Sequence, residues 1–253
     1  MSLNRVLSFA LAVSLVPTVA TFAADGYGSV TGQFVFEGDV PKVPFLVSKG
    51  DASAKDSAVC AAGNILNEDL VVDEKTKGIA NVFVYLRKAE DIHPDLAKSK
   101  KKEVIFDQKG CQFFPHAMIV RTDQVVKVVS DDSVAHNTHS FPLRNQAINF
   151  ILRPKDRVGI KIPSKRPEIL PIQVKCDIHP WMKAYWLILD HPYMAVTGKT
   201  GKFTIEKLPA GEHSFRVWQE KVGYVERSLK VTIKAGETVD LGAIKVPASK
   251  FKD

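Results

Sequence analysis

The segment Cys176-Asp177-Ile178-His179-Pro180-Trp181-Met182 places a thiol, an imidazole and a thioether within one short loop. A valine-containing segment precedes it at 169–175, and an apolar, aromatic segment follows it at 184–189. Upstream, Ala135-His136-Asn137-Thr138-His139 offers a second imidazole. Two His, one Cys and a weak axial Met are the donor set of a trigonal copper site, in which the soft thioether suits Cu(I). The spacing C-x-x-H-x-x-M between two strands therefore predicts copper binding, which a lone C-x-x-H would not.

These two motifs resemble those of the cupredoxins. The likeness is strongest to the short-loop type typified by amicyanin, in which a His-Asn-Val-His strand is followed by Cys-x-x-His-Pro-x-Met. It covers 104–190, about a third of the chain, and departs from the family at Thr138, where an aliphatic residue is usual. The resemblance implies a Greek-key β-sandwich and a copper ion that cycles between Cu(I) and Cu(II). The ligands that it implies are His136, Cys176, His179 and Met182.

His136 and His139 compete for the second imidazole position. Three residues separate them, so a regular strand would point them to opposite faces, and they are not expected to share one metal ion. The resemblance favours His136 as the ligand and leaves His139 at the surface or the sheet edge. Asn137 is then expected to tie the two ligand segments together by hydrogen bonds to the backbone.

The resemblance also implies how electrons reach the metal. In cupredoxins the His of the ligand loop usually reaches the surface, and here that residue is His179. A redox partner would then dock near His179 and Trp181, with Pro180 stiffening the loop between two ligands. Trp181 would shield the copper from water or contact the partner, although simple packing of the indole ring is an equal alternative.

The other cysteines predict a disulfide. If Cys176 binds the metal, Cys60 and Cys111 remain, and two cysteines in an oxidising compartment most simply pair. A bond between them would stabilise the fold by about 4 kcal/mol through chain entropy. The alternative is that Cys111 and nearby His116 form a second metal site. The three remaining histidines, which have no ligand-like neighbours, are expected to make ordinary hydrogen bonds: His93, His191 and His213.

The N-terminus has the pattern of a secretory signal peptide, 1–24. Arg5 is followed by an apolar run, 6–19, and by the small residues of Thr21-Phe22-Ala23-Ala24. The run is short for a transmembrane helix and polar sequence soon follows it. The prediction is a secreted or periplasmic protein with no membrane span after cleavage, and an uncleaved anchor is the alternative.

Composition excludes several other classes. The 253 residues suffice for one or two domains, and the net charge of +7 would favour an acidic redox partner. The lysine-rich run at 98–102 is more simply a solvated loop. No basic helix with interleaved aromatic residues occurs, so nucleic-acid binding is not expected. No nucleophile turn, phosphate loop or H-E-x-x-H motif occurs, and the protein is not expected to be an enzyme.

Many short alternating segments with almost no helical periodicity predict an all-β fold. Residues 117–121 and 125–129, separated by three turn residues, are predicted to form a hairpin. Asp131 and Asp132 fall at a turn, where carboxylates are common for local backbone reasons.

The last part of the chain, 191–248, resembles a second family. It carries a Gly-x-Phe strand, a Leu-Pro-x-Gly turn and an Ala-Gly-Glu turn, as in the transthyretin-like β-sandwich of carboxypeptidase regulatory-like domains. The first two strands of that pattern are absent just upstream and occur instead at 28–36 and 80–86. We therefore expect a discontinuous sandwich, 25–103 plus 191–248, that holds the copper domain, 104–190, as an insertion. The alternative is a separate N-terminal piece followed by two consecutive domains.

Three functions fit this sequence. The first is an exported blue copper protein that carries single electrons between redox partners, in a two-part chain that resembles methylamine-utilisation-like proteins. The second is a copper carrier without a redox role. The third is a β-sandwich adhesion or carbohydrate-binding module whose copper motif has degenerated, against which the complete ligand set argues.

Overall fold

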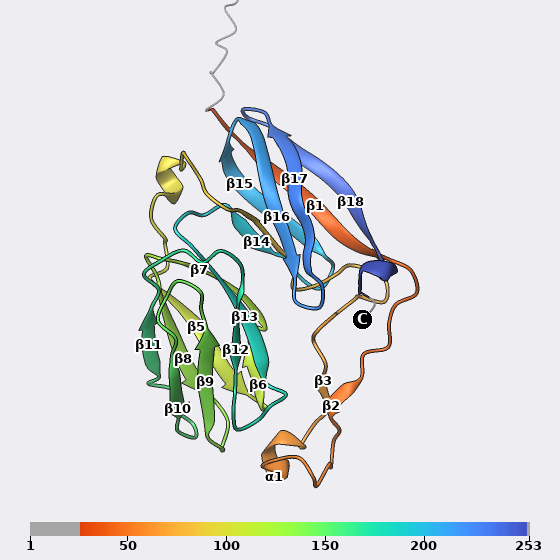
Figure 1. Ribbon diagram of the computed structural model, residues 1–253, viewed down its shortest axis with the longest axis vertical. Coiled ribbons are helices and arrows are strands. Elements are labelled where there is room, and N and C mark those ends of the chain that lie inside the picture. Colours follow the sequence, from red (N-terminus) through yellow and green to blue (C-terminus); the bar gives the residue numbers. More distant parts are fainter. Residues whose placement is uncertain (1–25, 252–253) are drawn as a thin grey trace, which may run out of the picture.

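The computed structural model describes residues 26–251, so the predicted signal peptide, 1–24, lies outside the described residues. The chain forms two β-sandwiches that lie end to end, with very little helix (Figure 1). The predicted all-β fold is confirmed. In the stretch 26–251, no helix has the length and apolar character needed to cross a bilayer.

The first sandwich contains the C-x-x-H-x-x-M loop. Its strands are β5 (Glu103–Lys109), β6 (Gln112–Phe114), β7 (Ala117–Arg121), β8 (Val125–Ser130), β9 (His136–Phe141), β10 (Asn149–Leu152), β11 (Ile160–Pro163), β12 (Ile172–Lys175) and β13 (Lys183–Leu189). One sheet has the order β10-β9-β12-β13-β7 and the other the order β11-β8-β5-β6. Phe106 and Trp186 pack edge to face in the core between them, with ring centroids 4.9 Å apart.

The hairpin predicted for 117–121 and 125–129 is wrong, although both strands exist. β7 pairs in parallel with β13, and β8 pairs in parallel with β5, so the two strands lie in different sheets. Gln124 carries the turn, because its amide N–H bonds to the Arg121 carbonyl and its side-chain oxygen accepts from the Arg121 N–H. Both strands are largely buried. Each pairs with a strand of its own sheet, β13 or β5, and not with the strand that is next to it in sequence.

The second sandwich draws its strands from both ends of the chain. They are β1 (Tyr27–Glu37), β4 (Phe83–Leu86), β14 (Met194–Val196), β15 (Lys202–Pro209), β16 (Gly211–Gln219), β17 (Gly223–Ile233) and β18 (Thr238–Pro247). Its sheets have the orders β15-β1-β18 and β14-β4-β16-β17. Early strands β1 and β4 therefore pair with late strands, and their apolar faces enclose one core.

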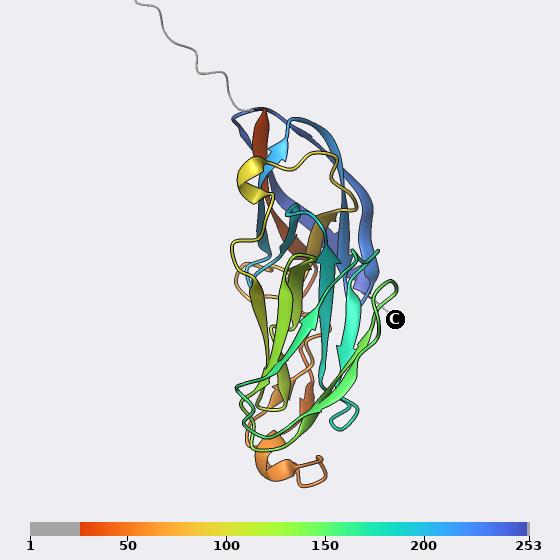
Figure 2. The ribbon, with the colours of Figure 1, turned by 90° about the vertical axis from the view of Figure 1, so that its left-hand side faces the viewer.

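Residues 45–66, which we call the strap, leave the second sandwich and run along the first to its far end (Figures 1 and 2). The strap contains β2 (Phe45–Val47), the one-turn helix α1 (Ser57–Cys60) and β3 (Ile65–Leu66). Val47, Cys60, Ala61 and Ile65 are buried in the core of the first sandwich, not of the second. Two short 3-10 helices, η1 (Pro94–Leu96) and η2 (Ala248–Phe251), lie outside this region.

The two sandwiches share a small apolar interface. Leu187 and Leu189 of β13 pack in one cluster with Phe83, Tyr85 and Trp218 of the second sandwich. All five side chains are at most 7 % exposed, so this interface excludes water. The contact covers the β7–β13 side of the five-stranded sheet.

Candidate metal centre

The loop between β12 and β13 is held in a tight turn by its own backbone. The Cys176 N–H donates to the Met182 carbonyl (3.1 Å), and the Met182 N–H donates to the His179 carbonyl (2.9 Å). The His179 N–H also points at the Cys176 sulfur, 3.4 Å away. Cys176, His179 and Met182 are each at most 2 % exposed, so all three side chains face the protein interior.

His136, at the start of β9, brings the second imidazole to this loop. A ring nitrogen of His136, the sulfur of Cys176 and a ring nitrogen of His179 all lie within 4.8 Å of one another. The two Nδ1 atoms are 2.9 Å apart, and His179 Nδ1 lies 3.7 Å from Cys176 Sγ. Three of the four predicted ligands therefore converge on one buried point, and Met182 is buried in the same core.

A carboxylate holds the far side of each imidazole. His136 Nε2 lies 2.8 Å from Asp132 Oδ2, and His179 Nε2 lies 3.0 Å from Asp56 Oδ2. When Nε2 carries the proton and donates it to a carboxylate, Nδ1 keeps its lone pair, which is the tautomer that binds metal. Two Nδ1 lone pairs that face each other at 2.9 Å need a proton or a cation between them. This donor set fits a soft cation such as copper.

The pKa values of Cys176 and His136 in the metal-free site also favour metal binding. Burial opposes ionisation of the Cys176 thiol, but hydrogen bonds with His136 and His179 outweigh it and lower its pKa to about 6. Burial likewise opposes protonation of His136, but hydrogen bonds with Asp132 and Cys176 raise its pKa to about 9. A thiolate beside an imidazolium is therefore the neutral-pH state. A metal ion would bind the thiolate and displace the imidazolium proton.

Asn137 ties the two ligand segments together, as predicted from the sequence. Its side-chain oxygen accepts from the backbone N–H groups of Asp177 (2.6 Å) and Ile178 (3.3 Å). Its side-chain nitrogen donates to the Asp177 carboxylate (2.8 Å). His139 points to the outer face of the sheet, where its Nδ1 lies 3.1 Å from the same carboxylate.

The expectation that His179 reaches the surface is wrong. Its side chain has 0 % exposure, because the strap lies over the ligand loop and presents Asp56 to its Nε2. Trp181 does pack beside His179, with ring centroids 5.3 Å apart, but it is half-buried and donates from Nε1 to the Cys111 carbonyl (3.1 Å). A partner cannot touch the His179 ring while the strap is in place.

A disulfide anchors the strap next to the site. Cys60 and Cys111 are bonded, with their Cα atoms 5.2 Å apart, which confirms the predicted pair. Their sulfurs and a His179 ring nitrogen lie within 4.8 Å of one another. Asp132 accepts from the Cys111 N–H (2.8 Å), so one network joins the disulfide to the carboxylate that holds His136.

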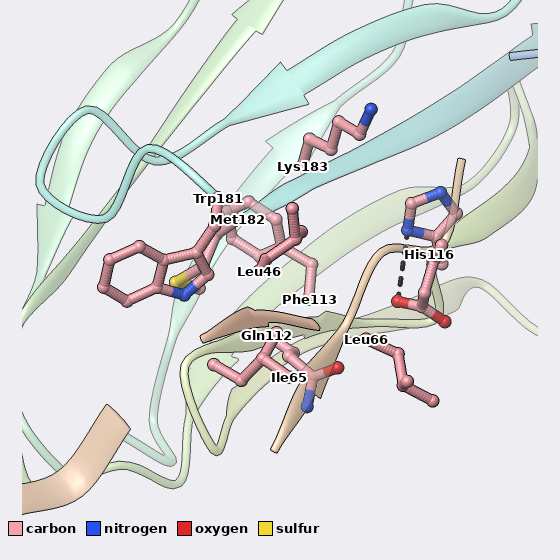
Figure 3. A pocket seen from close by; sticks show the side chains of 10 residues that line it. Leu46, Ile65, Leu66, Gln112, Phe113, His116, Trp181, Met182 and Lys183 are labelled. Carbon is pink, nitrogen blue, oxygen red and sulfur yellow. Dashed lines mark ion pairs between the residues drawn. The ribbon is translucent and has the colours of Figure 1, made fainter. Parts of the chain in front are cut away.

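The alternative of a metal site at Cys111 and His116 does not hold. Cys111 is in the disulfide, and both nitrogens of His116 contact carboxylates: Nε2 that of Glu220, and Nδ1 that of Glu68 (3.3 Å). Lys183 joins this cluster and lies 3.4 Å from Glu220 Oε2. His116, Lys183, Met182 and Trp181 line a cavity of about 10 Å³. Figure 3 shows these side chains. The cluster joins the ligand loop to the second sandwich, since Glu220 follows β16.

The His116 ion pairs predict a pH-dependent stability. Burial opposes the charged ring, but hydrogen bonds with Glu220 and Glu68 raise its pKa from 6.5 to about 9. Below pH 6.5 the folded protein gains the full benefit, on the order of 3 kcal/mol, and this is lost as the pH rises through about 9. Denaturant unfolding of wild type and His116→Gln should therefore differ most at pH 6 and least at pH 10.

The control for that measurement is His213→Gln, because His213 lies on β16, where its ring bonds to the Pro209 carbonyl and packs near Phe215 rather than against a carboxylate. The difference in free energy of unfolding between His213→Gln and wild type should not be largest at pH 6 and smallest at pH 10. If the difference in free energy of unfolding between wild type and His116→Gln stays constant from pH 6 to 10, the ion pairs of His116 do not stabilise the fold.

Sequence reasoning missed the two carboxylates of the site. Asp132 falls at a turn, where the sequence predicts only local backbone contacts, yet it is 5 % exposed. It accepts from the N–H groups of Gly110 and Cys111 while it holds His136. Asp56 is 123 residues from His179 in sequence and adopts a left-handed backbone conformation (φ 55°) at the start of α1. Its position depends on how the strap folds back, for which the sequence carries no local signal.

Comparisons with known proteins return structural likenesses only. No family model matches the sequence, and no curated protein matches it. A copper-containing nitrite reductase from Thermus scotoductus SA-01 is 18 % identical with a TM-score of 0.30, over 34 % of this chain and 22 % of that one. A point mutant of amicyanin in its Cu(I) form is 13 % identical with a TM-score of 0.31, over 36 % of this chain and 87 % of that one. A purple cupredoxin from Nitrosopumilus maritimus is 18 % identical with a TM-score of 0.28, over 35 % and 99 %.

Proposed function

We propose that this protein is an exported type 1 copper protein that carries single electrons between redox partners. The metal would be held by His136, Cys176 and His179, with Met182 as a fourth, weaker ligand. The observation that carries this proposal is the convergence of two imidazole nitrogens and one thiolate on a single buried point. Copper in such a set alternates between Cu(I) and Cu(II), and so takes up and releases one electron.

The chain's own groups are arranged to keep this site unchanged during a reaction. Asp132 and Asp56 each orient one imidazole through Nε2, and Asn137 fixes the backbone of the ligand loop. Because both imidazoles and the Cys176 sulfur have a second contact, and all four side chains are shielded from water, little has to move when the charge of the site changes. Low reorganisation of this kind favours fast electron exchange.

Burial favours a resident cofactor over exchangeable cargo. A carrier must pass its metal to other proteins, which requires an opening to the ligands. Here the donors are at most 2 % exposed, and the strap is bonded to the first sandwich by Cys60–Cys111. We therefore favour electron transfer over copper delivery. The disulfide also supports a periplasmic or extracellular location, where such bonds persist.

We infer further that the copper sandwich is an insertion in the second sandwich. The support is the pairing of β1 and β4 with strands that begin at residue 194 or later. The strap, although it lies before the insertion in sequence, packs with the inserted part. The second sandwich would then serve to position and stabilise the strap across the metal site.

The test is an absorption spectrum of the purified protein titrated with Cu(II). We expect an intense visible thiolate-to-copper band that ascorbate bleaches and that Cys176→Ser abolishes. Met182→Leu should change the reduction potential, whereas Met118→Leu, a matched change in the same core, should leave it unchanged. Tight Cu(I) binding without the band would favour the carrier. A protein that binds no copper would exclude both functions and leave a β-sandwich interaction module.

A further inference from the structure

The outer face of the sheet β10-β9-β12-β13-β7 is only half covered. On the β13–β7 side, Leu187, Leu189 and Ala117 pack under side chains of the second sandwich, such as Tyr85 and Trp218. On the β10-β9-β12 side, the described residues of the second sandwich form no apolar cluster with the sheet, and Ile151 and Phe141 stay exposed. The same sheet surface that forms the interface between the sandwiches therefore continues into open solvent.

The open half carries apolar side chains where an isolated domain would place polar ones. Ile151 on β10 is 64 % exposed and lies opposite Asn137 of β9. Phe141 at the end of β9 is 44 % exposed, and its ring packs 4.3 Å from that of His139. Leu143, just beyond β9, is 60 % exposed. Ile151 and Phe141 share this sheet face, with the pair His139 and Asn149 between them. Exposed apolar groups that gather on one face favour an interaction surface.

Cations accompany these apolar groups. Lys175 of β12 lies opposite His139, with its ammonium 5.6 Å from the centre of the Phe141 ring. Arg144 is exposed next to Leu143. Within the described part of the chain, neither cation has an ion-pair partner. The neighbouring acid Asp177 is already engaged by Asn137, His139 and Asn149. A second acid, Glu168, accepts from the Arg144 N–H, but Lys165 and Arg166, whose N–H groups donate to the Asn145 side chain, add two exposed cations. The cations of this region therefore outnumber its acids.

The same surface lies next to the metal donors. Lys175 directly precedes Cys176, and Asn137, on the outer face, directly follows His136. One layer of backbone separates the patch from the donor atoms. The other approach to the site, over His179, is closed by the strap.

We propose that the open half of this sheet, centred on Phe141, Ile151 and Lys175, is the docking surface for an acidic redox protein. The proposal rests on the proposed function and replaces docking at His179 and Trp181. Its occupant is chosen by charge complementarity, because unpaired Lys175 and Arg144 attract carboxylates while the apolar groups bury area. The rival occupant, a second copy of this basic chain, is disfavoured by like charge.

The first test needs no copper. Hexacyanochromate(III), a paramagnetic trianion, is added to ¹⁵N-labelled protein, and the broadening of each backbone amide signal is recorded. Amides of 139–143, 149–151 and 173–175 should broaden first, and Lys175→Glu should abolish this preference while Lys202→Glu on β15 leaves it intact. Broadening confined to the lysine-rich run at 98–102 would overturn the proposal. Concentration-dependent self-association seen by sedimentation would favour a second copy instead.

The second test measures electron transfer. Hexacyanoferrate(III) oxidises the Cu(I) protein, with one electron passing from copper to iron. Arg144→Glu/Lys175→Glu should lower the second-order rate constant at least about threefold at low ionic strength, and high salt should remove the difference. Lys199→Glu/Lys202→Glu, with the same change of net charge, should have a smaller effect. Equal effects of the two pairs would overturn the proposal. A protein that binds no copper refutes the proposed function, and the amide broadening still decides the docking surface.

Discussion

Replacing Cys60 and Cys111 with alanine is expected to lower the free energy of unfolding by about 4 kcal/mol, the chain-entropy value for a loop of this length. The two residues are 51 positions apart, and both are buried in the core of the first sandwich. Without the bond, the strap would be held only by its buried apolar side chains and by Asp56. Denaturant unfolding of the metal-free protein measures the loss. Addition of a thiol reductant to the wild type should reproduce it.

The same change should open the proposed metal site. Once the strap is free to lift, a Cu(I) chelator can reach His179, so copper transfer to bathocuproine disulfonate should become at least about tenfold faster. Asp56→Asn, which keeps the disulfide but replaces the carboxylate at His179 Nε2, should weaken copper affinity by about 10–100-fold, the usual cost of such a lost partner. It should change the transfer rate less than the disulfide variant does. An unchanged transfer rate in the disulfide variant would show that the strap does not control access.

Trp186→Ala is expected to lower the free energy of unfolding by about 3–5 kcal/mol, the cost of a large cavity in a core. Trp186 is 2 % exposed and packs edge to face on Phe106, which in turn stacks on Phe113 at 4.8 Å. These rings fill the first sandwich between its two sheets. Thermal or denaturant unfolding measures the effect.

Trp186→Phe is the matched control. The indole Nε1 of Trp186 is buried without a hydrogen-bond partner among the described residues, so its removal relieves a desolvation cost while most of the ring is kept. We expect a loss of less than about 1.5 kcal/mol. A loss as large as that of the alanine variant would show that the indole nitrogen has a partner in solution.

Local patterns in the sequence predicted much of this fold. Alternating apolar residues predicted the strands, and the spacing of Cys176, His179 and Met182 predicted a loop whose Cys and His side chains the fold brings together with His136. A strand's periodicity and a loop's donor spacing are properties of neighbouring residues, so they can be read without knowing what packs against them. The pairing of Cys60 with Cys111 followed from cysteine count and compartment.

Tertiary structure alone decided how those parts meet. β7 and β8, three residues apart, lie in different sheets because each finds its apolar partner elsewhere in the chain. His179 is buried because Asp56, 123 residues away, reaches it on the strap. The exposure of a side chain and the groups that hold it depend on contacts between residues far apart in the sequence. Such contacts form only if they offset the conformational entropy that the chain loses on folding. A short segment of sequence therefore does not predict them. The sequence by itself determined which side chains could bind copper, and the tertiary structure decided which of them water and partners can reach.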